Sequence, residues 1–288
     1  MTQPACPVER PAWRQGRWEG GVRQVAEETA VALTYNRTTY AVMMATPADL
    51  EDFAIGFSLT ERVIERAEEI EEIEIVEAAP GDGIEARMWI APECAAAMDE
   101  RRRVIAGPTG CGLCGLDSLA QALWPPPRVA PGLRLAPVEI EAAVAALAPG
   151  QALGRATRAV HAAGFWRPGH GLVALREDIG RHNALDKLAG ALARAGEDVG
   201  AGVIVMTSRV SVELVQKAAR MGASVLVAIS APTGLALRMA EAAGLTLVAV
   251  AREDGFELFT CPERIARQAV AKRPATASPD GEARLAEG

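Results

Sequence analysis

The sequence predicts an α/β protein in which an α+β domain is followed by an α/β domain. In the C-terminal half, short apolar runs alternate with amphipathic helical segments, which is typical of a largely parallel sheet covered by helices. In the N-terminal half, strand-like runs surround one strong helix signal. Three consecutive prolines at 125–127 enforce extended backbone between the halves. We therefore expect domains at 19–125 and 128–271.

The N-terminal half is expected to contain one long helix among several strands. The helix signal begins at Thr46, an N-cap residue, and Pro47 fits the first helical position. Leu50, Phe53 and Phe57 recur at helical spacing, so one face of this helix should be buried. The expected strands lie at 22–25, 30–35, 40–44, 73–75 and 84–90.

Other segments of this half are expected to be exposed or irregular. Eight glutamates at 61–77 indicate a solvated face, and 81–83 supplies a turn before the strand that returns at 84–90. A short helix is expected at 117–123. Residues 1–18 and the tail at 272–288, rich in Pro, Ala, Ser and charge, are expected to be disordered.

The C-terminal half has a regular rhythm of strands and helices. Helices are expected at 137–147, 183–193, 211–220 and 233–243. Strands are expected at 202–207, 224–229 and 245–250, after a strand or hairpin at 157–177. Gly222 and Gly244 stand where glycines commonly end helices.

Composition excludes several classes of protein. The net charge is -7, and no basic stripe exists beyond Arg101, Arg102 and Arg103, so we expect no nucleic-acid partner. No apolar run is long enough to span a bilayer, and the N-terminus lacks a signal-peptide core. Five cysteines, an odd number, do not indicate a secreted disulfide framework. We therefore expect a cytoplasmic protein without a membrane partner.

A glycine-rich segment at 110–115 holds the one closely spaced cysteine pair, Cys111 and Cys114. Zinc would need two further ligands, and no second cysteine or histidine pair is present, so no metal site is predicted. A thioredoxin-like pair would stand at a strand-to-helix junction rather than among glycines. A redox pair, a structural role and sulfur carriage stay open. Sulfur carriage fits best, because glycines give a loop the reach to present a thiolate to partners.

Three polar turns each follow an apolar strand and precede a helix. They lie at 178–183, 207–209 and 230–233. Carboxyl ends of parallel strands meet at one sheet edge, where ligands bind, and helix N-termini favour anions. The turns therefore predict a crevice suited to phosphate, with Arg181 and Arg209 at hand. The alternative is that Asn183, Ser211 and Thr233 are only helix caps and that His182 is structural. No standard dinucleotide or nucleotide-triphosphate motif is present.

Five segments together resemble the formate dehydrogenase accessory sulfurtransferases. They are Tyr35-Asn36, the stretch 42–57 (VMMATPADLEDFAIGF), 110–115 (GCGLCG), 178–187 (DIGRHNALDK) and 230–233 (SAPT). The resemblance covers about residues 20 to 260. It implies a second domain with the cytidine deaminase-like three-layer α/β/α fold, without the zinc of the deaminases. It also implies a cytoplasmic homodimer.

The resemblance further implies a sulfurtransferase activity. A cysteine desulfurase would hand sulfur to Cys111 as a cysteine persulfide, with Cys114 assisting. The sulfur would pass to the bis-molybdopterin guanine dinucleotide form of the molybdenum cofactor, for formate dehydrogenase. The alternative is a non-catalytic chaperone that binds this cofactor and delivers it to formate dehydrogenase.

The resemblance places a cofactor-binding stretch after the last strand. This stretch matches Val250, Ala251, Arg252, Glu253, Asp254 and Gly255. Gly255 departs from the family pattern, in which a basic residue is common there. The remaining residues expected to bind the guanine dinucleotide moiety are Arg181, His182, Asn183, Ser208, Arg209 and Thr233.

Overall fold

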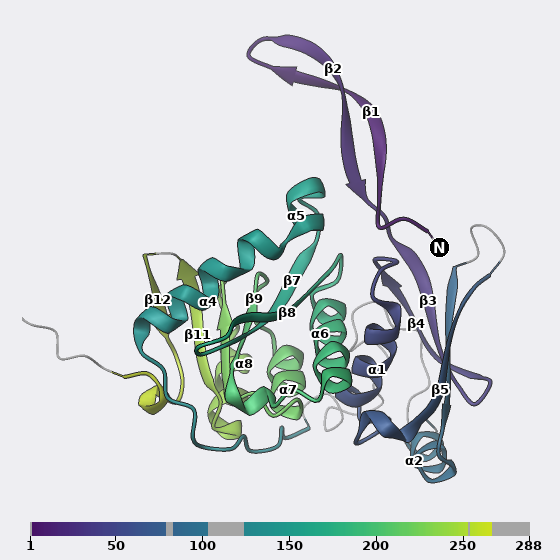
Figure 1. The fold of residues 1–288 in the computed structure, drawn as a ribbon, viewed down its shortest axis with the longest axis vertical. Coiled ribbons are helices and arrows are strands. Elements are labelled where there is room, and N and C mark those ends of the chain that lie inside the picture. The colour runs from purple at the N-terminus through teal and green to yellow at the C-terminus, as the bar shows by residue number, and fades with distance from the viewer. Residues whose placement is uncertain (1, 79–82, 103–123, 253, 267–288) are drawn as a thin grey trace, which may run out of the picture.

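The structure is a computed structural model that describes residues 2–78, 83–102, 124–252 and 254–266. The described residues form a two-stranded hairpin, a four-stranded sheet and a six-stranded sheet (Figure 1). The mixed α/β class predicted from the sequence is confirmed. The domain limits stay predictions, and the expected helix at 117–123 and tail at 272–288 lie outside the described residues.

The chain begins with a long β-hairpin, so the expectation of disorder at 1–18 was wrong. Strand β1 (Ala5–Arg14) pairs with β2 (Arg17–Ala26) along its whole length. Gln15 and Gly16 at the tip both have positive φ, as a type I′ hairpin turn requires. Prolines in β1 made this stretch look irregular, but a strand with a free edge tolerates proline. The hairpin projects away from the rest of the molecule (Figure 1).

A four-stranded sheet with the order β4-β3-β6-β5 follows. Its strands are β3 (Thr29–Tyr35), β4 (Thr38–Ala45), β5 (Ile70–Glu77) and β6 (Ile84–Ile90). The adjoining helices are α1 (Leu50–Thr60), α2 (Pro92–Arg102) and the short 3-10 helix η1 (Ala67–Glu69). One face of the sheet forms a buried core with these helices, to which Leu33, Tyr35, Phe53 and Phe57 belong. The expected burial of Leu50, Phe53 and Phe57 is confirmed.

The start of α1 differs from the prediction. The helix begins at Leu50, and its N-cap Asp49 has a left-handed backbone without a side-chain cap bond. Thr46 is instead fully buried against the C-terminal half. Its N–H donates to Asp178 Oδ2 at 2.9 Å, and its carbonyl accepts from Lys187 Nζ at 2.9 Å. Thr46 therefore bonds to these distant partners instead of forming a local helix-capping bond.

The six-stranded sheet has the order β12-β11-β10-β9-β7-β8. Its strands are β7 (His161–Arg167), β8 (Gly171–Asp178), β9 (Val203–Met206), β10 (Val225–Ala228), β11 (Thr246–Arg252) and β12 (Gly255–Leu258). Strands β9, β10 and β11 run parallel, whereas β7 is antiparallel to both β8 and β9. The expected hairpin at 157–177 and the three expected parallel strands are confirmed.

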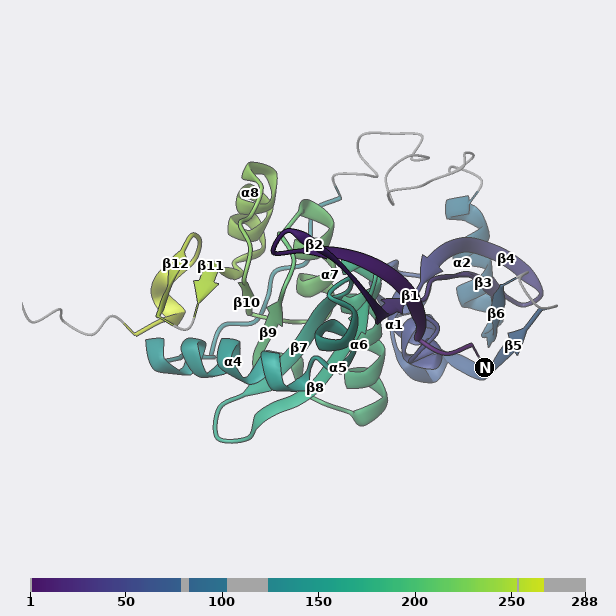
Figure 2. The same cartoon turned by 90° about the horizontal axis from the view of Figure 1, so that it is seen from above.

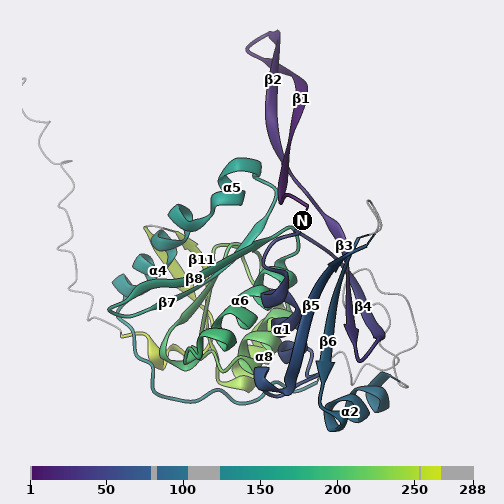
Figure 3. The same cartoon turned by 45° about the vertical axis from the view of Figure 1, so that its right-hand side comes forward.

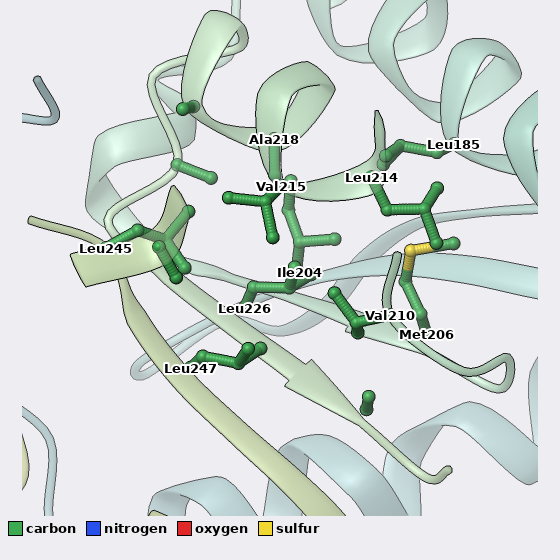
Figure 4. Close-up of a cluster of buried hydrophobic side chains, with 14 of the residues drawn as sticks. Leu185, Ile204, Met206, Val210, Leu214, Val215, Ala218, Leu226, Leu245 and Leu247 are labelled. Atoms are coloured by element: carbon green, nitrogen blue, oxygen red, sulfur yellow. The ribbon is translucent and has the colours of Figure 1, made fainter. Parts of the chain in front are cut away.

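Helices cover both faces of this sheet (Figures 1 and 2). They are α4 (Pro137–Gly150), α5 (Ala152–Thr157), α6 (Arg181–Ala195), α7 (Val212–Arg220) and α8 (Gly234–Ala243), with 3-10 helices η2 (Val199–Ala201) and η3 (Pro262–Arg264). One core joins α6, α7 and α8 to the sheet; Figure 4 shows Leu214 and Val215 of α7 against Ile204 and Leu226. A second core places α4 on the opposite face. The layering is therefore α/β/α, and its likeness to cytidine deaminases stays a prediction.

Helices α1 and α6 lie side by side between the two sheets (Figure 3). Charged groups tie them together: the Asp52 carboxylate accepts from Arg176 Nε and from Arg194 Nη1, each at 2.8 Å. Within the C-terminal half, Lys187 Nζ lies 2.7 Å from Asp178 Oδ2, and both fully buried side chains also bond to the backbone of Thr46 from the other half. This interface fixes the N-terminal sheet against the sheet that carries the polar turns.

Candidate functional site

The carboxyl ends of β8, β9, β10 and β11 share one edge of the six-stranded sheet, since these strands run in the same direction. Backbone bonds join neighbouring turns there. Val210 N donates to Ala231 O at 3.3 Å, and Val250 N donates to Ser230 O at 3.3 Å. The three polar turns therefore lie on one edge, as predicted. The bonds join the second and third turns, whereas β7 separates them from the turn at 178–183. Four strand spacings separate β8 from β11, so this carboxyl edge is roughly 19 Å long.

Arg181 and His182 begin helix α6 directly after β8. Arg181 Nε and His182 Nε2 are buried, and neither has a hydrogen-bond partner among the described residues. Ser211 Oγ, at the start of α7, is also buried and unpartnered there, with Ser211 only 9% exposed. Unpaired buried polar atoms are rare, and each is a candidate contact for a ligand. Two helix N-termini therefore present unsatisfied polar groups to one edge.

Glu213 completes this cluster from the first turn of α7. Its Oε2 lies 3.9 Å from His182 Nε2, beyond hydrogen-bond distance. Burial, together with the cations of Arg181 and Lys217, lowers the pKa of His182 to about 4 although Glu213 opposes the shift. His182 is therefore a neutral imidazole at neutral pH.

His161 lies at the same edge, as the first residue of β7 opposite Asp178. Burial, and next the Arg181 cation, lower the pKa of His161. The sequence prediction omitted His161 and Glu213 from the site. Nothing in their local spacing marks them, because His161 reaches the edge through the antiparallel β7, and Glu213 resembles an ordinary acid in a first helical turn.

Three other predicted site residues form hydrogen bonds within the protein that stabilise this edge of the sheet. Asn183 is buried, and its Nδ2 donates to Met44 O at 2.9 Å and to Asp178 Oδ1 at 3.0 Å. The Ser208 hydroxyl donates to Arg209 O at 3.0 Å, and Thr233 Oγ1 accepts from Ala236 N at 3.3 Å. The alternative reading of Thr233 as a helix cap is confirmed. Ser211 makes no side-chain cap bond, so that reading fails for Ser211.

The stretch 250–255 joins β11 to the edge strand β12. Arg252 and Gly255 are register partners, so the chain turns back between them. The Arg252 guanidinium donates to the carbonyls of Ile229 and Ala251. Arg209, Arg252 and Asp254 are exposed, whereas Ala251 is buried and Val250 half-buried. Glu253 lies outside the described residues. The edge thus carries exposed arginines at its β9–β11 end.

The predicted sulfur carriers Cys111 and Cys114 lie outside the described residues. The chain is described again from Trp124, whose carbonyl accepts from Gln216 Nε2 of α7 at 2.9 Å. The Arg62 guanidinium lies 5.2 Å from the centre of the Trp124 ring. Trp124 is therefore held against α7, the helix that begins beside Ser211 and carries Glu213.

The described residues contain no group of three metal-binding side chains, and no described helix is long and apolar enough to cross a membrane. The prediction of no metal site stays open, because the cysteine pair lies outside those residues.

The fold and site define an α/β protein whose polar helix N-termini meet at the carboxyl edge of a parallel sheet. The chain belongs to the FdhD/NarQ family, whose model matches residues 26–266. It is 52% identical over 263 residues to the sulfur carrier protein FdhD of Agrobacterium fabrum, covering 90% of this chain and 95% of that one. The sulfur carrier protein FdhD of Brucella abortus is 54% identical over 259 residues, and the match covers 90% of this chain and 96% of that one.

A solved structure shares the fold. It is a crystal structure described as a formate dehydrogenase accessory protein from Desulfotalea psychrophila. Its TM-score is 0.70 at 27% identity, and the match covers 91% of this chain and 99% of that chain. The family resemblance inferred from the sequence is confirmed.

Proposed function

We propose that this protein is a sulfurtransferase that carries sulfur as a persulfide on Cys111 during maturation of formate dehydrogenase. The observation that carries the proposal is its identity of more than half, over nine-tenths of the chain, with proteins named sulfur carriers. The solved relative described as a formate dehydrogenase accessory protein supports the client. The glycine-rich cysteine pair supplies the chemistry.

The loading step needs only thiol chemistry. The Cys111 thiolate attacks the outer sulfur of a persulfide on a cysteine desulfurase. The sulfur–sulfur bond of the donor breaks, its electron pair leaves on the donor thiolate, and Cys111 keeps the outer sulfur as a persulfide. Cys114, three residues further along the sequence, would release that sulfur: its thiolate would attack the inner sulfur of Cys111, expelling hydrosulfide and forming a disulfide.

The acceptor is the bis-molybdopterin guanine dinucleotide cofactor, a substrate of this protein. The carboxyl edge suits its phosphates, because helix N-termini and the Arg181 cation favour anions. His182, which is uncharged at neutral pH, could donate or accept a hydrogen bond there. Arg181 Nε and Ser211 Oγ are available to bind, and Glu213 Oε2 is an unpartnered acceptor for a base N–H. Arg209 and Arg252 would bind phosphates at the β9–β11 end of the edge.

The remaining partners follow from the same proposal. The sulfur donor is a cysteine desulfurase, the client is formate dehydrogenase, and the compartment is the cytoplasm, where such donors and reduced thiols occur. The protein acts as a homodimer.

Complementation of a strain that lacks this protein tests the proposal. The Cys111→Ala variant should give no formate dehydrogenase activity, whereas Cys6→Ala, which changes a cysteine of the hairpin, should restore it. Normal activity with Cys111→Ala would instead support the rival role of a cofactor-binding chaperone, for which the thiols are dispensable. Measuring accumulation of each variant separates loss of sulfur transfer from loss of protein.

A further inference from the structure

Buried polar atoms without partners gather where helices α6 and α7 begin. Among the described residues, seven buried side-chain nitrogen or oxygen atoms have no hydrogen-bond partner. Four of them lie at the starts of these two helices: Arg181 Nε, His182 Nε2, Ser211 Oγ and Glu213 Oε2. Such atoms are rare in folded proteins, so four at one place indicate a site that a ligand completes.

Glu213 differs from Asp178, an acid that ends β8 at the same edge. Asp178 Oδ2 accepts from Thr46 N at 2.9 Å and lies 2.7 Å from Lys187 Nζ. Asp178 Oδ1 accepts from Gly180 N at 2.7 Å. Glu213 Oε2 is equally buried but accepts no hydrogen bond from the described residues. Asp178 therefore stabilises the fold, whereas the Glu213 carboxylate stays available as an acceptor.

Polar groups are fully paired one turn further along both helices. Asp186 and Lys217 stand four residues after His182 and Glu213, on the same sides of α6 and α7. Lys217 Nζ lies 2.9 Å from Asp186 Oδ1, and Thr60 Oγ1 donates to the same oxygen at 2.6 Å. Loose packing between α6 and α7 therefore does not explain the unpartnered atoms, which belong to the helix ends at the carboxyl edge.

The donors and acceptors at these helix ends match the edge of a guanine base. A carboxylate holds only acceptors, so Glu213 repels phosphate and binds groups that offer N–H donors. Guanine offers two adjacent donors, its N1–H and its 2-amino group, beside the acceptor O6. Donors for O6 are the Ser211 hydroxyl, the Arg181 guanidinium and the N–H groups of the first turn of α7, which have no intrahelical partner.

We propose that Glu213 selects the guanine base of the cofactor by accepting hydrogen bonds from its N1–H and its 2-amino group, while Ser211 and Arg181 donate to O6. The phosphates then lie toward Arg209 and Arg252 at the β9–β11 end of the edge, away from the Glu213 carboxylate. The inference rests on the proposed guanine dinucleotide substrate and assigns the residue that distinguishes its base from other purines.

Calorimetric titration of the full chain with nucleoside diphosphates tests base selection. The native protein should bind guanosine diphosphate at least about tenfold more tightly than inosine diphosphate, which lacks only the 2-amino group, because a hydrogen bond to a charged acceptor is lost. Adenosine diphosphate carries the same phosphates and should bind more weakly than guanosine diphosphate. Equal Kd values for guanosine and inosine diphosphates would overturn the proposal.

The variant Glu213→Gln should change which base is preferred. An amide offers one acceptor and one donor, which matches xanthine, because xanthine has a carbonyl where guanine has the 2-amino group. Glu213→Gln should therefore bind xanthosine diphosphate at least about tenfold more tightly than the native protein does, a gain that misfolding cannot produce. Glu68→Gln, which changes an exposed acid of the N-terminal half, should match the native protein. No gain for xanthosine diphosphate in Glu213→Gln would overturn the proposal.

Two further measurements separate the parts of the site. Ser211→Ala should weaken binding of guanosine and inosine diphosphates by the same factor, because both bases carry O6, and α7 loses no cap bond. A change in the ratio of the two Kd values would contradict the assignment of Ser211 to O6. Persulfide loading of Cys111 in the native protein involves no nucleotide. Loading without base preference would therefore overturn the base site alone, and base preference without loading would count against sulfur transfer alone.

Discussion

Gly56 of α1 and Gly190 of α6 lie in backbone contact where the two helices cross. A Cβ added to Gly56 would stand 2.7 Å from Gly190 N and 1.7 Å from the Asp186 carbonyl oxygen. One added to Gly190 would stand 1.9 Å from the Asp52 carbonyl oxygen. Only glycine permits this approach, and it brings Thr46, Asp52 and Glu61 within reach of charged partners on the other helices. The crossing is therefore what fixes one half of the chain against the other.

Substituting Gly190 by alanine should strongly destabilise the protein. The backbone atoms that the new methyl group meets cannot rotate away, so the helices must separate. We expect a loss of at least about 2 kcal/mol in the free energy of unfolding. Gly234→Ala is the matched control, since its Cβ would meet only the end of the Arg238 side chain at 3.8 Å. Urea unfolding measures both, and equal stability of the two variants would refute the close crossing.

Lys217 should be essential to the stability of the same interface. Its Nζ lies 2.6 Å from Glu61 Oε1 and 2.9 Å from Asp186 Oδ1. Although burial opposes the charge, the two carboxylates raise the pKa of Lys217. Lys217→Met leaves Asp186 buried without its cation, so we expect a loss of about 3–5 kcal/mol.

Two comparisons make the Lys217 prediction specific. Adding Asp186→Leu to Lys217→Met should recover part of the loss, because no unpaired buried charge then remains. Arg87→Met breaks an exposed pair with Glu74 and should have little effect. Additive losses in the double variant would show that Lys217 and Asp186 do not act as a pair.

His182 should make stability depend on pH below neutrality. The folded protein binds the imidazole proton near pH 4, whereas an unperturbed histidine binds it near pH 6.5. Between these values the unfolded chain holds more protons, so the free energy of unfolding falls as pH drops from 6.5 to 4, by up to about 3 kcal/mol. His182→Gln should flatten this slope, and the exposed His170→Gln should not. NMR titration of the His182 ring should give a pKa near 4, and a value near 6.5 would refute the burial argument.

Arg181 should contribute to binding of guanosine diphosphate, a probe for one end of the proposed substrate. Loss of a charge-assisted contact weakens binding by about 1.5–3 kcal/mol, or roughly tenfold to a hundredfold in Kd. Calorimetry on Arg181→Gln should show this loss, with Arg155→Gln on α5 as the exposed control. Unchanged affinity in Arg181→Gln would remove this arginine from the site.

Local patterns predicted most of the described C-terminal half and missed features set by distant contacts. Strands such as β9 and helices such as α6 were predictable because apolar periodicity reports burial directly. Thr46 looked like an N-cap, but Asp178 and Lys187 lie more than 130 residues away in the sequence and take its polar groups. Glu213 reaches the site only because α7 begins at the shared edge. The order of strands in the sheet decides which distant residues meet at the site, and local sequence patterns do not predict that order.

Whether Cys111 carries sulfur can be measured by peptide mass spectrometry. The purified full chain is incubated with a cysteine desulfurase and cysteine, digested, and its cysteine peptides are compared with those of Cys111→Ala and Cys114→Ala. We expect one added sulfur atom on the Cys111 peptide of the native protein and of Cys114→Ala, and none on the peptides of Cys6, Cys94 or Cys261. A Cys111 peptide that never gains sulfur while the desulfurase itself is loaded would contradict this expectation.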